Sequence, residues 1–326
     1  MVEVIGLTKL YGENRAIHDV SFKVNRGEVV GFLGPNGAGK STTMRIITGA
    51  MAPTEGIARV DGIDVFENPV AVKRKIGYLP ETPPVYMDMR VRDYLLYVAE
   101  LKGVPKADLK KNVSYALERT QLTQVEKRLI GNLSKGFRQR VGIAQALVSN
   151  PEVLILDEPT VGLDPRQVAE IRSLIQELRG QHTIILSTHI LSEVEATCQR
   201  VIIIHKGKIV AEDSLENLTK LKSGTNKAIV RVREVERAQK VLEEFAPGVK
   251  VRKGRLSDEF EISFAGQTSG HVMDDLAQFI IKNNLGIVEL RLAHANLEEV
   301  FLSLTYGSKS SDQLSNSVNH VEEVTL

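Results

Sequence analysis

Short apolar runs alternate with amphipathic segments through the first two thirds of the chain. The runs are rich in β-branched residues, as in strands buried on both faces of a parallel sheet, and the other segments repeat apolar positions at helical spacing. The pattern predicts strands at residues 29–33, 153–156, 183–186 and 201–204, and helices at 40–48, 138–148 and 168–178. Such alternation is typical of an α/β domain, which we expect over residues 1–220.

A mostly helical stretch interrupts this alternation between two of the core strands. Within residues 83–150, Val91, Leu95 and Val98 recur at helical spacing, and similar patterns follow further along. An amphipathic helix buries one apolar stripe, so these segments need a common core. We expect a helical subdomain that is inserted into a mixed-sheet core.

A second pattern begins at Lys227. Its order is strand, helix, strand, strand, helix, strand, at residues 229–232, 235–245, 249–256, 260–264, 272–281 and 287–292. This βαββαβ order indicates a ferredoxin-like fold. We therefore expect a small α+β accessory domain over residues 221–306.

One more helix is predicted after that domain. Its positions i, i+3, i+4 and i+7 are Leu297, Val300, Phe301 and Leu304, an apolar stripe that must pack on something. The stripe fits either its own domain or a partner protein. Residues 307–326 are rich in Ser and Asn, contain no aromatic residue, and are expected to be a disordered tail.

Composition narrows the classes of protein that remain. With 326 residues, 42% of them hydrophobic, the chain is long enough for more than one domain. The 42 Lys and Arg residues against 41 Asp and Glu residues leave a formal net charge of +1, so no nucleic-acid partner is expected. Cys198 is the only cysteine, and the chain starts without the pattern of a secretory signal. No apolar run reaches the roughly 20 residues of a spanning helix, so we expect a cytosolic chain that does not cross a membrane by itself.

A glycine-rich segment stands between the strand at 29–33 and the helix at 40–48. It reads Gly34-Pro35-Asn36-Gly37-Ala38-Gly39-Lys40-Ser41. This is the context of a P-loop, whose backbone N–H groups and helix N-terminus bind phosphate oxygens. We expect Lys40 to neutralise the β- and γ-phosphates and Ser41 to ligate Mg²⁺, and we count Thr42 among the nucleotide contacts.

Two adjacent carboxylates, Asp157 and Glu158, end the apolar strand at 153–156. Asp157 can hold the Mg²⁺ shell while Glu158 orients and deprotonates an attacking water. An aspartate in this place is also suited to capping the next segment. The P-loop favours the catalytic interpretation, because phosphoryl transfer needs charge stabilisation and a positioned water together.

His189 follows the strand at 183–186 in the sequence Ser187-Thr188-His189. A lone histidine is more often structural than catalytic. However, ligands of open parallel sheets gather at the carboxyl ends of the strands. His189 is therefore a candidate for contact with the γ-phosphate.

With these motifs in this order, the chain resembles the ATP-binding cassette subunit of an ABC transporter over at least residues 1–220. Residues 133–140, Leu-Ser-Lys-Gly-Phe-Arg-Gln-Arg, are similar to the family signature, and residues 162–164, Gly-Leu-Asp, to its D-loop. His189 is similar to the switch histidine. Tyr11 matches the aromatic residue that the family stacks on adenine, and local packing is the alternative for this residue.

The resemblance implies a P-loop NTPase cassette that binds ATP and Mg²⁺ and pairs with another cassette. Ser134 and Gly136 precede a helix, where a hydroxyl, N–H groups and the helix dipole can bind an anion. Taken alone, these residues also fit a plain helix cap. In the family they face the γ-phosphate of the partner subunit, so one P-loop and one signature imply a second copy or a paralogue.

Residue 81 departs from the pattern of many family members. The chain has Glu81 where they have a glutamine, and a glutamate can still accept a water or ligate Mg²⁺. A solvated loop carboxylate is the alternative. Residues 82–100 follow, at the border that receives the coupling helix of the membrane partner in the family.

Glu81, the Leu-Ser-Lys-Gly signature and residues 296–305 most resemble exporter-type cassettes of the multidrug, sodium-efflux and gliding-motility group. The resemblance implies an ATPase that dimerises on Mg-ATP, drives a separate transmembrane permease and resets on hydrolysis. Such a subunit lies at the cytoplasmic face of the membrane, held there through the permease. The alternatives are a soluble cassette ATPase that acts on the ribosome or DNA, and a non-catalytic ATP-dependent interaction module.

Overall fold

The computed structural model describes residues 1–221, 227–254, 256–264, 272–293 and 297–306. The chain forms two compact units, Met1–Leu215 and Glu216–Leu326. The expected disordered tail, residues 307–326, lies outside the described residues. Within the ranges given above, the structure contains no helix long and apolar enough to cross a membrane.

The centre of the first unit is a six-stranded sheet in the order β10-β9-β3-β8-β7-β6. Five strands run parallel and β10 pairs antiparallel with β9, so the sheet is mixed, as predicted. The four predicted strands appear as β3, β7, β8 and β9, each at or slightly beyond its expected bounds. The strands are β3 (Val29–Leu33), β6 (Ile76–Leu79), β7 (Val153–Asp157), β8 (Thr183–Thr188), β9 (Arg200–His205) and β10 (Lys208–Ser214).

A second sheet in this unit is antiparallel, with the order β2-β1-β4-β5, and the sequence analysis did not predict it. Its pairing contains register shifts between β1 and both neighbours, and these shifts break the alternation of apolar and polar positions that marks a strand. The strands are β1 (Val2–Tyr11), β2 (Asn14–Val24), β4 (Glu55–Val60) and β5 (Ile63–Asp64).

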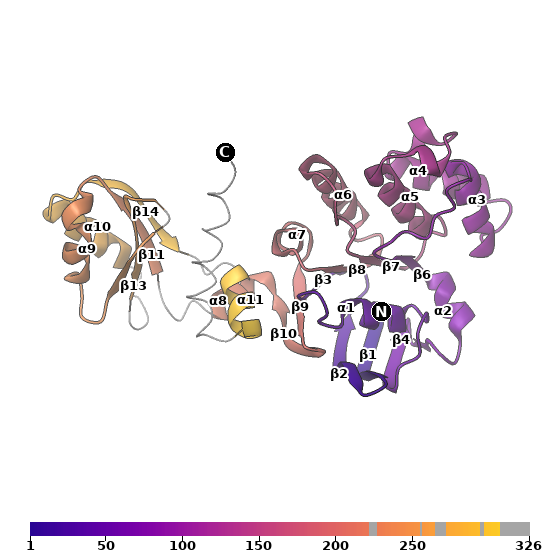
Figure 1. The fold of residues 1–326 in the computed structure, drawn as a ribbon, viewed down its shortest axis with the longest axis horizontal. Coiled ribbons are helices and arrows are strands. Elements are labelled where there is room, and N and C mark those ends of the chain that lie inside the picture. The colour runs from indigo at the N-terminus through magenta and orange to yellow at the C-terminus, as the bar shows by residue number, and fades with distance from the viewer. Residues whose placement is uncertain (222–226, 255, 265–271, 294–296, 307–326) are drawn as a thin grey trace. The chain divides into compact units, whose positions relative to one another are not determined.

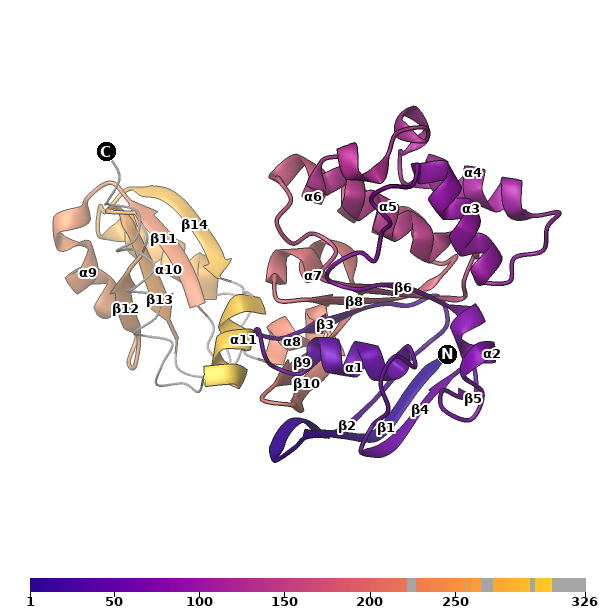
Figure 2. The same cartoon turned by 45° about the vertical axis from the view of Figure 1, so that its right-hand side comes forward.

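Helix α1 (Lys40–Ile47) lies between the two sheets (Figure 2). Its buried Met44 and Ile46 join one apolar core with Val2 of β1 and Phe32 of β3. This packing fixes the first turn of α1 at the carboxyl end of β3. The short helix α2 (Pro69–Lys75) follows β5 and leads into β6.

The other face of the six-stranded sheet is covered by helices α3 to α7 (Figures 1 and 2). Three of them stand between β6 and β7, as the expected helical insertion, and two 3₁₀ turns, at Thr123–Val125 and Ile130–Asn132, connect them. The helices are α3 (Val91–Leu101), α4 (Leu109–Arg119), α5 (Lys135–Leu147), α6 (Pro165–Leu178) and α7 (Leu191–Thr197).

Side-chain caps explain why α5 and α6 begin before the predicted residues. The Ser134 hydroxyl accepts a hydrogen bond from the Phe137 N–H at 3.4 Å. Asp164 Oδ1 accepts one from the Gln167 N–H at 2.9 Å, and Pro165 occupies the first turn. These side chains satisfy free N–H groups of the first turn, which apolar periodicity does not register.

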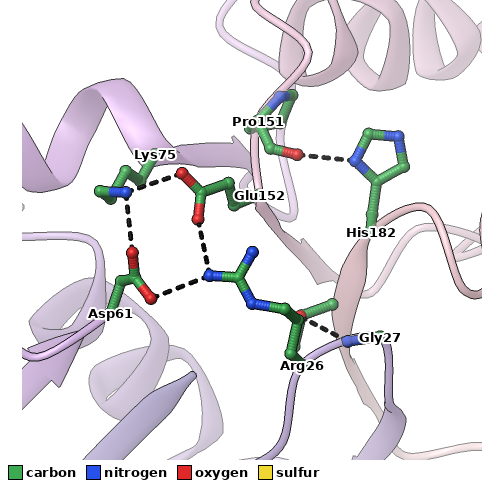
Figure 3. Close-up of polar contacts among 8 residues, drawn as sticks. Arg26, Gly27, Asp61, Lys75, Pro151, Glu152 and His182 are labelled. Carbon is green, nitrogen blue, oxygen red and sulfur yellow. Dashed lines mark hydrogen bonds and ion pairs between the residues drawn. The ribbon is translucent and has the colours of Figure 1, made fainter.

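Charged side chains connect four segments of the first unit at the amino-terminal end of β7 (Figure 3). Lys75 Nζ lies 2.9 Å from Asp61 and 2.7 Å from Glu152. Arg26 completes the ring, at 3.0 Å from Asp61 and 3.3 Å from Glu152. We call these four residues the charge ring.

The second unit contains a four-stranded antiparallel sheet in the order β12-β13-β11-β14. With α9 and α10 inserted in βαββαβ order, this is the topology of a ferredoxin-like fold. The core includes Val230, Leu242, Phe260 and Leu276. The elements are β11 (Lys227–Val232), α9 (Val235–Glu243), β12 (Lys250–Lys253), β13 (Glu259–Ser263), α10 (Val272–Lys282) and β14 (Ile287–Ala293).

Two further helices belong to this part of the chain, α8 (Leu215–Leu221) and α11 (Leu297–Tyr306). Helix α11 is the predicted last helix. Its Val300 and Phe301 are buried within the chain, whereas Leu304 is 38% exposed.

Candidate active site

The glycine-rich loop connects β3 to α1, as the sequence predicts. A Cβ atom on Gly34 would lie 2.4 Å from the Ile204 carbonyl oxygen, so no larger residue fits there. Gly39 has φ +106°, a backbone conformation that L side chains rarely adopt. Ser41 and Thr42 lie half-buried in the first turn of α1.

Lys40 turns back over this loop. Its ammonium group donates to the Gly34 carbonyl oxygen at 2.8 Å and to the Pro35 carbonyl oxygen at 3.3 Å. It also lies 3.2 Å from Glu158 Oε1, and both side chains are almost completely buried. A positive charge is therefore held at the centre of the loop, beside a carboxylate.

Asp157 ends β7 next to this charge. The Ser187 hydroxyl donates to Asp157 Oδ1 at 2.7 Å, and the Ser41 hydroxyl is close enough to influence the same carboxylate. Burial raises the pKa of Asp157, and the hydroxyls of Ser187 and Ser41 oppose that rise. The structure thus brings together Ser41 and Asp157, two of the three predicted Mg²⁺ ligands.

These oxygen ligands fit a magnesium ion that is bound together with a nucleotide. Mg²⁺ at such sites is held by one or two protein carboxylates, and phosphate oxygens and water fill most of its remaining positions. Among the described residues, no three His, Cys, Asp or Glu side chains gather into a metal site of their own. A nearby divalent cation would also favour the ionised form of Asp157, against the effect of burial.

Glu158 lies between the Lys40 ammonium group and the His189 imidazole ring. Its backbone has φ +51°, which is uncommon for a residue other than glycine and turns the side chain out of the alternation of the strand. His189 Nδ1 lies 2.9 Å from Glu158 Oε2, and the Glu158 N–H donates to the Ser187 carbonyl oxygen at 2.8 Å. Lys40, Glu158 and His189 therefore form a continuous polar chain at the carboxyl edge of the sheet.

Strand order explains why these residues meet. Strand β8 pairs with both β3 and β7, so the loop after β8 stands between the P-loop and the two carboxylates. Ser187 is the contact that sequence reasoning missed, although it directly precedes Thr188 and the predicted His189. Its position after an apolar run at the same sheet edge was the only signal available.

Glu81 and Tyr11 stand apart from this chain of contacts. Glu81 follows β6 at the same edge, is exposed, and forms no hydrogen bond with Ser41 or Asp157 in the described part of the chain. Tyr11 ends β1 and is 46% exposed. Its hydroxyl lies 2.9 Å from the Met51 sulfur, and the Lys9 ammonium lies 5.7 Å from its ring centroid.

The predicted signature begins α5, on the sheet face opposite α1. The Ser134 hydroxyl caps its own helix, as noted above. Gly136 packs against Gln167, since a Cβ atom on this glycine would lie 2.4 Å from Gln167 Oε1. In the described residues, neither Ser134 nor Gly136 forms a hydrogen bond with the P-loop of the same chain.

Comparison with known proteins identifies the family. Residues 17–161 match the family model described as ABC transporter. The bacitracin transport ATP-binding protein BcrA of Bacillus licheniformis is 40% identical over 240 residues, which cover 71% of this chain and 78% of that protein. The chain belongs to the ABC transporter family of ATP-binding proteins. The predictions of the family, of the P-loop NTPase fold and of ATPase activity are confirmed.

With another relative, the similarity extends over almost the whole of both chains. The linearmycin resistance ATP-binding protein LnrL of Bacillus subtilis (strain 168) is 31% identical over 307 residues, 94% of this chain and 98% of that protein. A dimeric ATP-binding cassette in a post-hydrolysis state, bound to ADP and Pi, matches with a TM-score of 0.61 and 27% identity. This alignment covers 66% of this chain and 99% of the other. The chain is thus an ATP-binding subunit of the ABC type and an ATPase.

Proposed function

We propose that this subunit hydrolyses Mg-ATP as one half of a pair of cassettes, and that the cycle drives a separate transmembrane permease of exporter type. The contacts that join Lys40, Glu158 and His189 at the carboxyl edge of the sheet carry this proposal. Hydrolysis needs three groups at one point: a positive charge that neutralises the phosphates, a general base and a sensor of the γ-phosphate. Lys40, Glu158 and His189 supply these in that order.

Nucleotide binding begins at the P-loop. Backbone N–H groups among residues 36–40, at the N-terminus of α1, bind the phosphates, with Ser41 and Thr42 in the first helical turn. Lys40 exchanges its contacts with the Gly34 carbonyl and Glu158 for phosphate oxygens. The exposed ring of Tyr11 stacks on adenine.

Mg²⁺ neutralises charge on the transferring phosphoryl group when it is bound. Ser41 and Asp157 would hold this ion, and the hydrogen bond from Ser187 orients the Asp157 carboxylate. The exposed Glu81 would be the third protein ligand, directly or through a water.

Glu158 acts as the general base. As the water oxygen attacks the γ-phosphorus, a Glu158 carboxylate oxygen accepts the water proton, while the bond to the leaving ADP oxygen breaks. His189, at 2.9 Å from Glu158, orients this carboxylate and contacts the γ-phosphate. The positive φ of Glu158 directs the side chain to this position.

A second cassette completes each site. Ser134 and Gly136, at the N-terminus of α5, offer a hydroxyl and N–H groups to the γ-phosphate held by the partner cassette. The dimeric arrangement of the similar cassette supports a pair of subunits, either two copies of this chain or this chain and a paralogue.

The permease docks beside residues 82–100. Tyr86, Met87 and Tyr97 are 50%, 51% and 40% exposed there, and Tyr86 contacts the rings of Tyr94 and Tyr97. Exposed aromatic and Met side chains in a group are typical of a protein interface. Through this contact the subunit lies at the cytoplasmic face of the membrane.

The two similar proteins support the exporter type, since one is named for bacitracin transport and the other for linearmycin resistance. Residues 1–220 act as the cassette in this scheme, with residues 83–150 as the helical subdomain. Residues 221–306 act as an accessory domain.

The Glu158→Gln variant tests the proposal. We expect it to bind Mg-ATP, to remain in the closed dimer and to lose roughly 10²- to 10⁴-fold in turnover, because the amide cannot accept the water proton. Steady-state hydrolysis and size-exclusion chromatography in Mg-ATP measure these effects, with the exposed Glu195→Gln as the control. Undiminished hydrolysis would contradict the role of Glu158.

The same variant identifies the partner. We expect a multi-span membrane protein to co-purify with it from detergent-solubilised native cells in Mg-ATP, and to be lost in ADP. Mass spectrometry reads the result. Ribosomes or DNA in place of a membrane protein would overturn the transporter function and leave the ATPase chemistry intact.

A further inference from the structure

Helix α7 contains a buried carboxylate that the mechanism above does not use. Glu193 is only 1% exposed. In the described residues, no Lys, Arg or His forms an ion pair with it. Removing a carboxylate from water costs free energy unless other groups replace the lost hydrogen bonds. The groups that bond to the Glu193 carboxylate therefore indicate what it does.

Both oxygens of Glu193 accept hydrogen bonds from threonine hydroxyls. Thr160 Oγ1 donates to Oε1, and Thr188 Oγ1 donates to Oε2 at 2.8 Å. The two threonines are themselves buried, at 4% and 0% exposed. Thr160 lies in the loop that follows Glu158, and Thr188 directly precedes His189.

The carboxylate therefore joins the loop after β7 to the last residue of β8, directly before His189. Strands β7 and β8 are neighbours, and the catalytic side chains that follow them meet at 2.9 Å between His189 Nδ1 and Glu158 Oε2. Thr188 Oγ1 also accepts a hydrogen bond from the Ile190 N–H at 3.1 Å. The residues on both sides of His189 are thus fixed through one hydroxyl.

A carboxylate suits this bridge better than an amide. Because it offers only acceptors, both threonine hydroxyls must donate to it, and the lone pairs of Thr188 Oγ1 stay free for the Ile190 N–H. An amide would present N–H donors to one of the hydroxyls, which would then have to reverse its direction. The bridge would keep its shape but lose one of its defined contacts.

We propose that Glu193 is a positioning residue for ATP hydrolysis, which holds the loops after β7 and β8 so that His189 contacts Glu158 in the productive orientation. The inference rests on the proposed roles of these two residues. It assigns to Glu193 an effect on turnover that is larger than its effect on nucleotide binding. Both hydrogen bonds of its carboxylate go to Thr160 and Thr188, and the P-loop is reached only indirectly, through the Thr188 carbonyl oxygen that accepts from the Gly34 N–H at 3.3 Å.

Substitutions at Glu193 separate these effects. We expect Glu193→Ala to lower kcat about 10- to 100-fold, since small misplacement of a catalytic group costs that much, while KM for ATP changes by less than about threefold. We expect the kcat of Glu193→Gln to lie between the kcat of Glu193→Ala and that of the wild type. The matched control is Glu195→Gln, an exposed glutamate of the same helix, which keeps wild-type kcat.

Thr160 provides a second, milder pair of variants. Thr160→Val removes the hydroxyl and keeps the shape, whereas Thr160→Ser keeps the hydroxyl. We expect the valine variant to lose kcat and the serine variant to retain it. Equal kcat in both would overturn the bridge, and this comparison holds even if Glu193→Ala does not fold.

A double-mutant cycle decides whether Glu193 acts through the catalytic pair. If it does, Glu193→Ala combined with His189→Ala loses no more activity than His189→Ala alone. If the losses of activity in the two single variants multiply in the double variant, Glu193 does not act through His189, and the positioning role is overturned. The same conclusion follows if Glu193→Ala loses ATP binding and is partly unfolded at the assay temperature, which would leave Glu193 a structural role. A wild-type protein without ATPase activity would overturn the proposed function, and this inference with it.

Discussion

At the scale of single residues, burial shifts the pKa of a histidine and so makes stability depend on pH. His182 is 3% exposed, and its Nδ1 lies 2.6 Å from the Pro151 carbonyl oxygen (Figure 3). Its Nε2 has no hydrogen-bond partner in the described part of the chain. Burial lowers the pKa of His182, and the hydrogen bond to Pro151 only partly opposes this.

This shift predicts acid sensitivity. The unfolded chain binds a proton at His182 near pH 6.5, whereas the folded chain binds it only at lower pH. The free energy that His182 contributes is therefore present above pH 6.5 and falls as the pH drops through and below that value, by at most about 1.4 kcal/mol per pH unit.

We expect His182→Gln to flatten the fall in unfolding free energy below pH 6.5, relative to the wild type. Urea unfolding of both proteins between pH 8 and pH 5 measures the difference. A gap between the two curves that stays constant with pH would show that His182 does not carry the effect.

At the scale of elements, periodicity located four of the six strands of the central sheet, β3, β7, β8 and β9, because these short apolar runs are almost wholly buried. It also located α1, α5, α6 and the helical insertion from their apolar stripes, but it did not predict the strands β6 and β10 or the helix α7. It missed β1, β2 and β4, whose register shifts interrupt the alternation. It also began α5 and α6 too late, since caps such as Ser134 and Asp164 have no apolar side chain.

The charge ring is an interaction between elements that periodicity does not predict. Hydrogen bonds to Glu152 and Asp61 raise the pKa of Lys75, and the one from Lys75 lowers the pKa of Asp61. The ring joins α2 and the turn after β4 to the segment before β7. Its side chains are partly exposed, so water and salt screen it.

We expect Lys75→Gln to lower the free energy of unfolding by about 1 kcal/mol or less at low salt, and by less at high salt. Urea unfolding at both salt concentrations measures this. Lys111→Gln, at an exposed lysine of α4, is the control. A loss that is the same at both salt concentrations would indicate lost packing of the Lys75 side chain instead of lost charge pairing.

At the scale of the whole molecule, each unit has its own apolar core. The cluster that joins the two sheets of the first unit draws all its residues from the segment before Leu215, and the second cluster draws all its residues from the segment after it. Phe260 is among the largest fully buried side chains and lies in the second core.

We expect Phe260→Ala to destabilise the second unit by about 3–5 kcal/mol through the cavity that it leaves. ATP affinity at the first unit should stay within about twofold, because the P-loop draws on the other core. Calorimetric unfolding and nucleotide titration measure these effects, with Ile281→Ala, at a 64% exposed position, as the control. A large loss of ATP affinity would show that the two units are energetically linked.

The sequence by itself determined the chemistry that each segment offers. A P-loop needs glycines, Lys40 and Ser41 within a few residues, and two carboxylates after an apolar run are a local pattern as well. The tertiary structure decided which of these groups meet. Only the strand order puts the loop after β8 between β3 and β7, only the fold gives Glu158 its positive φ, and only long-range packing buries Glu193 between two threonines. These features depend on residues far apart in the chain, and local periodicity carries no information about them.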